Sequence, residues 1–166
     1  MTQLRNKAIK GFKVGDAFTV SRTFSEKDMA AFAEVTRDYN PVHFDERFAG
    51  AKNFNARICH GLLVASILTE IGGQVGWLAS KMNFRFKKPV FFGDRISCRL
   101  TINDINAKGK AKADAVFKNQ DGDTVIEAKL EGILPGMQEK QVLKAMLAEG
   151  DPTNKIGDEG EGPYER

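Results

Sequence analysis

The sequence predicts an α+β fold in which an antiparallel sheet wraps around one apolar helix. Residues 61–77 begin with a run that is apolar on nearly every side, which is typical of a buried helix. Residues 82–132 contain segments in which apolar and polar residues alternate, which is typical of strands with one face on a core and the other in water. Only the apolar helix is suited to cover the apolar face of these strands. A sheet around one central helix is the hot-dog architecture.

Two elements are expected before the central helix. Residues 17–24 should form a short strand. Ser25 can cap the helix that follows, with Asp28 three residues later in a weaker variant of the capping box. One face of this helix carries Met29, Phe32, Ala33 and Thr36.

The second half is expected to be mostly strands. The alternating segments are residues 82–86, 96–102, 111–117 and 126–132, and Asp-Gly-Asp at 121–123 is a hairpin turn signal. Residues 138–149 have the pattern of a short amphipathic helix. Residues 150–166 are rich in Gly, Asp and Glu and have little to bury, which predicts a mobile tail. We therefore expect one domain at residues 1–136 and a C-terminal extension at 137–166.

Composition excludes several classes of protein. A chain of 166 residues with a net charge of +3 and interspersed charges gives no strong case for nucleic-acid binding. Two cysteines are too few for a disulfide framework. Met1 to Lys10 lacks the apolar region of a signal peptide, and the apolar run from Leu62 to Leu68 is too short to cross a membrane. We expect a cytoplasmic protein without a membrane or nucleic-acid partner.

Both histidines of the chain fall between Asp38 and Gly61. Pro41 has a fixed φ and pushes Asn40 out of the α region, so the preceding helix should stop near Asp38 and the chain should bend. Asp38 and His43 would then face one pocket from either side of the bend. A neutral imidazole and a carboxylate are the usual pair for moving protons near neutral pH. The competing interpretation is a plain turn in which His43 bonds a backbone carbonyl.

The segment ends at His60 and Gly61, immediately before the central helix. The N–H groups of a first helical turn are unpaired and lie at the positive end of the helix dipole, so the Gly61 N–H could bind an oxyanion. Gly61 could equally serve only to let the chain enter the helix. His60 is expected to be a structural hydrogen-bonding residue. Two histidines and two isolated cysteines do not make a convincing metal site.

This region resembles the MaoC-like (R)-specific enoyl-CoA hydratases. The resemblance rests on Asp-Tyr-Asn-Pro-Val-His at 38–43, followed by Ile-Cys-His-Gly at 58–61 and an apolar helix, and it spans roughly Val14 to Leu134. It implies that Asp38 and His43 are the catalytic pair and that the Gly61 N–H polarises the thioester carbonyl. In that family a hydroxyl residue further along the helix often supports the aspartate, which by spacing is Thr69, with Ser66 as the other candidate.

The resemblance implies reversible hydration of a trans-2-enoyl-CoA to an (R)-3-hydroxyacyl-CoA, with CoA as part of the substrate and without a metal or redox cofactor. Asn40 is expected to shape the turn beside the substrate. The lysines at 87–88 and 108–112 could meet CoA phosphates, but we favour solvated strand faces. The candidates for the wall of the acyl groove are Phe32, Phe54, Leu62 and Leu63, each of which could equally belong to the core.

Two other classes stay open. A hot-dog acyl-CoA thioesterase would need a carboxylate on the central helix, and Glu70 is available. A non-catalytic dimeric module that binds acyl-CoA is the second. Exposed strand edges are usually paired or covered, so we expect at least a homodimer.

Overall fold

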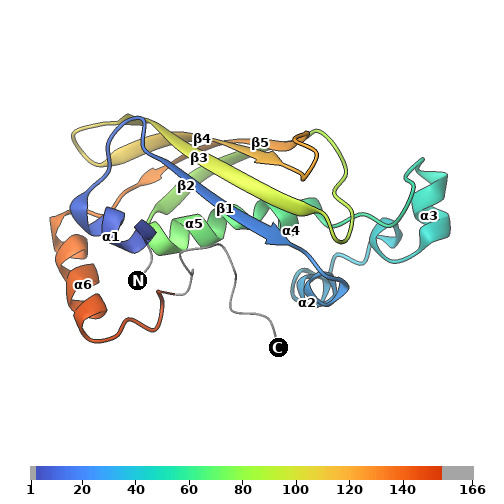
Figure 1. Cartoon of the computed structure of the whole chain (residues 1–166), viewed down its shortest axis with the longest axis horizontal. Helices are drawn as coiled ribbons and strands as arrows, with labels where there is room; N and C mark the ends of the chain where they lie inside the picture. The colour runs from blue at the N-terminus through green and yellow to red at the C-terminus, as the bar shows by residue number, and fades with distance from the viewer. Residues whose placement is uncertain (1–2, 155–166) are drawn as a thin grey trace.

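The computed structural model describes residues 3–154 and contains a five-stranded antiparallel sheet in the order β1-β3-β4-β5-β2 (Figure 1). The strands are β1 (Ala17–Thr23), β2 (Leu78–Phe86), β3 (Arg95–Ile105), β4 (Lys110–Lys118) and β5 (Thr124–Ile133). Successive residues of β4 alternate between exposed and buried without exception, as the sequence pattern predicts. The α+β hot-dog architecture is confirmed.

The central helix differs in one respect from the prediction, because it is broken at Ser66 into α4 (Gly61–Ala65) and α5 (Ile67–Val75). The Ser66 hydroxyl donates to the Leu63 carbonyl at 2.6 Å, and the Ser66 N–H is shared between the carbonyls of Leu62 and Leu63. A serine hydroxyl that bonds an earlier carbonyl competes with the helical ladder. Helix α5 then ends at Gly76, whose φ of 69° is the left-handed conformation that glycine adopts readily at a helix end.

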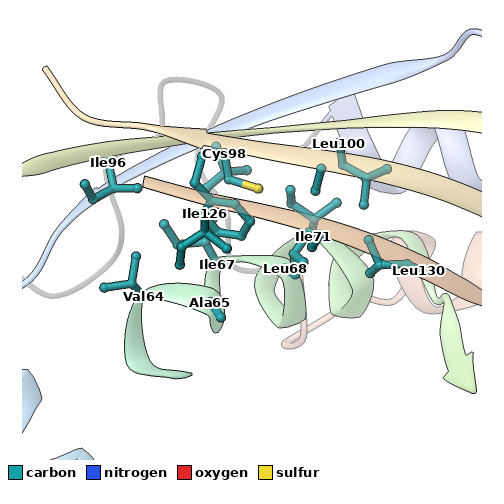
Figure 2. Packing of buried hydrophobic residues seen from close by; sticks show 14 of the residues in the cluster. Val64, Ala65, Ile67, Leu68, Ile71, Ile96, Cys98, Leu100, Ile126 and Leu130 are labelled. Carbon is teal, nitrogen blue, oxygen red and sulfur yellow. The ribbon is translucent and has the colours of Figure 1, made fainter. Parts of the chain in front are cut away.

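The core lies between these two helices and the inner face of the sheet. Figure 2 shows side chains of α4 and α5, including Ile67 and Ile71, pointing at residues of β3 and β5, including Cys98 and Ile126. Ile67, Ile71 and Cys98 are completely buried. Burial of an aliphatic side chain of this size is worth about 1.5–3 kcal/mol, so the helices and the sheet stabilise each other.

The segment before the central helix forms three short helices at one end of the molecule: α2 (Glu26–Thr36), the 3₁₀ helix η1 (Pro41–His43) and α3 (Glu46–Ala51). Ser25 caps α2 in a complete capping box with Asp28, and Asp45 caps α3 through the N–H groups of Arg47 and Phe48. Arg37 ends α2 in the left-handed conformation, at φ 59°. The predicted bend after Arg37 is therefore present.

Helices α1 (Gln3–Lys10), which the sequence analysis did not predict, and α6 (Met137–Ala148) lie together at the opposite end (Figure 1). Beside them, Asp151 faces Arg5 at 3.6 Å with almost no exposed side-chain surface, and the Gln74 amide of α5 donates to the Thr153 carbonyl. Residues 151–153 are thus held against the fold, which differs from the expected mobile tail. The rest of that tail, residues 155–166, lies outside the described residues.

Strand β2 is an edge of the sheet and is exposed along most of its length. Its exposed apolar side chains include Leu78, 74% exposed, and Phe86, 51% exposed. Within residues 3–154, none of the helices has both the length and the apolar character needed to cross a bilayer.

Candidate active site

Asp38, His43 and His60 come together where α2, η1 and the start of α4 meet. One side-chain atom from each residue, a carboxylate oxygen of Asp38 and a ring nitrogen of each histidine, lies within 4.8 Å of the other two atoms. His43 and His60 are buried, whereas half of the Asp38 side chain is exposed. A carboxylate and an imidazole at this separation can hold one water molecule between them.

The surroundings of His43 determine which of its nitrogens can accept a proton. Nδ1 lies 2.8 Å from the carbonyl of Ile58, which can only accept, so Nδ1 carries the proton and Nε2 has a free lone pair. Burial lowers the pKa of His43 from its ordinary value; the Ile58 carbonyl raises it, His60 lowers it further and Asp38 raises it. His43 is therefore a neutral base at neutral pH.

Asp38 is held by the backbone around it. Its Oδ1 accepts from the N–H of Asn40 at 3.2 Å, and its carbonyl accepts from Nε2 of His60 at 2.9 Å. The side chain of Asn40 accepts from the N–H of Val42, which closes the turn that starts η1. The Asn-Pro turn therefore fixes the distance from Asp38 to His43.

The two groups open onto a cavity of about 500 Å³. Gly61 lines it at the first position of α4, where a backbone N–H has no partner inside the helix. A Cβ on Gly61 would lie 2.7 Å from the ring of Phe86, so that ring covers the glycine closely. The lining consists of Asp38, His43, Phe54, Ile58, Cys59, His60, Gly61, Leu62, Val64, Phe86, Lys87, Lys88, Pro89, Val90 and Ile126.

The carboxylate and the two imidazoles thus lie beside a largely apolar cavity. The model of the protein family described as MaoC like domain matches residues 13–124 of this chain. The chain belongs to the MaoC-like domain family. The resemblance stated from the sequence is thereby confirmed.

The relatives of this MaoC-like domain include several hydratases and dehydratases. It is 35% identical over 134 residues to the mitochondrial 3-hydroxyacyl-[acyl-carrier-protein] dehydratase of Arabidopsis thaliana, covering 75% of this chain and 79% of that protein. It is 33% identical over 97 residues to the (R)-specific enoyl-CoA hydratase of Aeromonas caviae, covering 56% of this chain and 72% of that protein. The solved structure of the (R)-hydratase from A. caviae superposes with a TM-score of 0.71 at 29% identity, covering 76% of this chain and 99% of that one.

Five predicted site residues line the cavity of this MaoC-like domain: Asp38, His43, Phe54, Gly61 and Leu62. The structure places the others elsewhere. Leu63 is buried in the hydrophobic core. Phe32 packs against that core, and the centroid of its ring lies 5.2 Å from that of the His60 ring.

The hydroxyl groups of Thr69 and Ser66 were expected to support Asp38, but in the structure they donate to backbone carbonyls of the central helix. The Thr69 hydroxyl donates to the Ser66 carbonyl at 2.7 Å, and the Ser66 hydroxyl donates to the Leu63 carbonyl. Both hydroxyl groups satisfy their own helix, because a short polar side chain within a helix reaches the preceding turn first. The backbone N–H of Asn40 bonds the Asp38 carboxylate instead.

Several lining residues were not predicted, because they come from the far half of the chain. Phe86, Lys87 and Lys88 stand where β2 ends. Both lysines are paired, Lys87 with Glu127 at 2.9 Å and Lys88 with Asp123 at 2.8 Å. The sequence signal for these residues is the Lys-Lys pair after an alternating segment, a pattern that is also typical of a solvated strand face.

Two further titratable groups near the central helix differ in their access to the cavity. Glu70 does not line it; its carboxylate lies 3.8 Å from Arg22 of β1, and burial raises its pKa. Cys59 does line the cavity, but burial raises the pKa of its thiol to about 12. The Cys59 thiol is therefore protonated at neutral pH and a poor nucleophile.

Proposed function

We propose that this enzyme reversibly hydrates a trans-2-enoyl-CoA to an (R)-3-hydroxyacyl-CoA. The observation that carries the proposal is the juxtaposition of the Asp38 carboxylate and His43, with donor atoms within 4.8 Å, at the wall of an apolar cavity. The general class of reaction is that of its relatives, which include an (R)-specific enoyl-CoA hydratase and a 3-hydroxybutyryl-CoA dehydratase.

In the proposed mechanism a water molecule is held between Asp38 and His43. Nε2 of His43 takes one proton from the water as its oxygen bonds to the β-carbon. The Asp38 carboxylate then receives this proton from the His43 imidazolium and passes it to the α-carbon, so that both groups end the cycle as a neutral imidazole and a carboxylate. Positioned acid–base groups of this kind typically contribute about 10²–10⁴-fold in rate.

The thioester oxygen gains negative charge during this addition. The Gly61 N–H is the proposed donor to it, because it lines the same cavity and heads helix α4. One such donor is typically worth about 10²–10³-fold in rate.

We propose no metal or redox cofactor. Addition of water to a double bond involves no net oxidation. The nitrogen of His60 that lies near Asp38 is Nε2, and it bonds a backbone carbonyl, so His60 is poorly disposed to complete a metal site with Asp38 and His43. CoA would then be part of the substrate only.

The thioesterase alternative is less well supported. A thioesterase would need a carboxylate on the central helix beside the thioester, whereas Glu70 is outside the cavity lining and faces Arg22. A non-catalytic binding module would have no need of a neutral histidine with a free Nε2 beside a carboxylate.

The decisive experiment is a spectrophotometric assay with crotonyl-CoA, a free-thiol assay alongside it and chiral analysis of the product. Loss of the enoyl absorbance without thiol release, giving the (R)-3-hydroxy product, would support the proposal. Thiol release would identify a thioesterase, and binding without turnover a binding module. Because two of the relatives are named as acyl-carrier-protein dehydratases, the same assay on crotonyl-acyl carrier protein tests the carrier.

The cytoplasmic location expected from the sequence stays a proposal. Two relatives, from Arabidopsis thaliana and Solanum lycopersicum, are named as mitochondrial. Fractionation of cells that express the natural protein would decide between these compartments.

A further inference from the structure

The second histidine of the chain, His60, is more constrained than a cap residue needs to be. It occupies the N-cap position of α4, yet its side chain makes no capping hydrogen bond. It is 1% exposed, and its Nε2 lies 2.9 Å from the carbonyl of Asp38. A carbonyl can only accept, so Nε2 carries the proton and Nδ1 has the lone pair. Nδ1 is buried without a hydrogen-bond partner among residues 3–154, which agrees with this tautomer.

The same ring is stacked on His43. The centroids of the two imidazoles are 3.7 Å apart, and the ring planes differ by 28°. Phe32 and Phe44 pack against His60 with centroids at 5.2 Å and 6.2 Å, so the position of the His60 ring is fixed on several sides. His60 therefore contacts both members of the proposed catalytic pair, one through a hydrogen bond and the other through its ring face.

We propose that His60 is a positioning residue that holds Asp38 and His43 at the separation needed to share one water molecule. This inference rests on the proposed hydratase function. The Nε2–H of His60 fixes the backbone of Asp38, which lies in an irregular segment between α2 and η1. Its ring blocks one face of His43, whose Nδ1 is already held by Ile58. With Nδ1 and one ring face occupied in this way, His43 presents Nε2 to the cavity.

Electrostatics support this role. His43 must accept a proton during turnover, and two cationic rings stacked at 3.7 Å would repel each other. The neighbouring His60 lowers the pKa of His43, while the carboxylate of Asp38 raises it. The other charged groups lining the cavity are Lys87 and Lys88, which are paired with acidic residues and unchanged by substitution of His60.

Two substitutions separate the two contacts. His60→Gln keeps an N–H donor near the position of Nε2 and removes the ring, whereas His60→Phe keeps a stacked ring and removes the donor. We expect each to lower kcat for enoyl-CoA hydration by about 10–100-fold with little change in KM, because displacement of reacting groups by about 1 Å can cost 10²-fold. In His60→Gln the acid limb of the kcat/KM profile should move to higher pH, since the pKa of His43 is no longer lowered by His60.

The matched control is Val75→Ala, at the far end of α5, where the side chain is 1% exposed and does not line the cavity. It should lower the thermal unfolding midpoint and leave kcat unchanged. If both His60 variants keep kcat and the pH profile of the natural protein, or change KM alone, the positioning role is wrong.

A second measurement needs neither turnover nor a folded variant of His60. The chain has only two histidines, so His43→Gln assigns both imidazoles in a ¹⁵N NMR spectrum of the natural protein. We expect His60 as the Nε2–H tautomer and His43 as the Nδ1–H tautomer. A His60 protonated at Nδ1 would overturn the inference. An inactive natural protein with the expected tautomers would contradict the proposed function and leave the geometry of His60 established.

Discussion

At the scale of single residues, one proline-containing turn arranges the chemistry. Pro41 starts the 3₁₀ helix that ends at His43, and Asn40 closes the turn by accepting from the N–H of Val42. Asp38 and His43 are thereby brought to one side of the chain within five residues. Both groups lie in the segment between α2 and α3 and not in the core between helix and sheet, so their chemistry can be changed without emptying that core.

Substitution of either member of the pair should abolish most of the activity. We expect Asp38→Asn and His43→Gln each to lower kcat by about two or more orders of magnitude, the range for loss of a positioned acid or base. The measurement is enoyl-CoA hydration by purified variants whose circular dichroism matches the natural protein. A folded variant with nearly natural turnover would refute the assignment, and a double variant no slower than the worse single variant would indicate that the groups act as a unit.

The pH dependence of the reaction follows from His43. Because burial lowers its pKa below the ordinary value of 6.5, the group stays neutral, and able to accept a proton, to lower pH than a solvated histidine. We expect kcat/KM to fall only as the pH drops below about 6.5, the ordinary pKa of histidine. A pH–rate profile measures this, and an acid limb centred above that value would contradict the assigned environment.

At the scale of elements, the break in the central helix gives adjacent residues different roles. Helix α4 is only five residues long and places Leu62 at the cavity, 59% exposed, while Leu63 is buried in the core at 7%. The sequence could not separate the two, because both belong to one apolar run. The orientation of α4 against the sheet separates them.

Trimming these two leucines should therefore have different effects. Leu62→Ala should shift the preference from crotonyl-CoA toward octenoyl-CoA, because space for a methylene is worth about 1–3 kcal/mol in discrimination. Leu63→Ala should leave the chain-length profile unchanged and lower the free energy of unfolding by about 2–5 kcal/mol, as for other buried leucines. Kinetics over a series of enoyl-CoAs and urea denaturation measure the two effects. An unchanged profile in folded Leu62→Ala would show that the acyl groove lies elsewhere.

At the scale of the whole molecule, the sheet has an unprotected edge. Strand β2 is an outer strand of the described sheet and carries exposed Leu78, Met82 and Phe86. Exposed apolar edges of this kind are normally paired or covered in native proteins. Phe86, the last residue of the same strand, lines the cavity.

We therefore predict a homodimer, or a higher oligomer, in which β2 contributes to the interface. Sedimentation velocity at assay concentration should give at least twice the mass of one chain. The double variant Leu78→Asp and Met82→Asp should shift the equilibrium toward a smaller species. Lys112→Asp on the exposed face of β4 is the control and should leave the mass unchanged. A stable, active monomer would refute the prediction.

The sequence by itself determined the features that depend on local pattern. Alternation along β3, β4 and β5 indicated a one-sided sheet, and the apolar run after Gly61 indicated its buried partner. The spacing from Asp38 to His43 indicated that a carboxylate and an imidazole lie close together, because a proline turn constrains the chain over only a few residues. These are short-range effects, which a single sequence contains.

Only the tertiary structure decided which distant groups complete the site. His60 stacks on His43 across 17 positions of sequence, and Phe86 covers Gly61 because β2 ends beside the start of α4. Helix α1 and residues 151–153 come together only because segments from the two halves of the chain pack at the same end of the fold. Contacts of this range depend on how the sheet curves around α4 and α5, and that curvature results from the packing of many side chains at once, which no local pattern specifies.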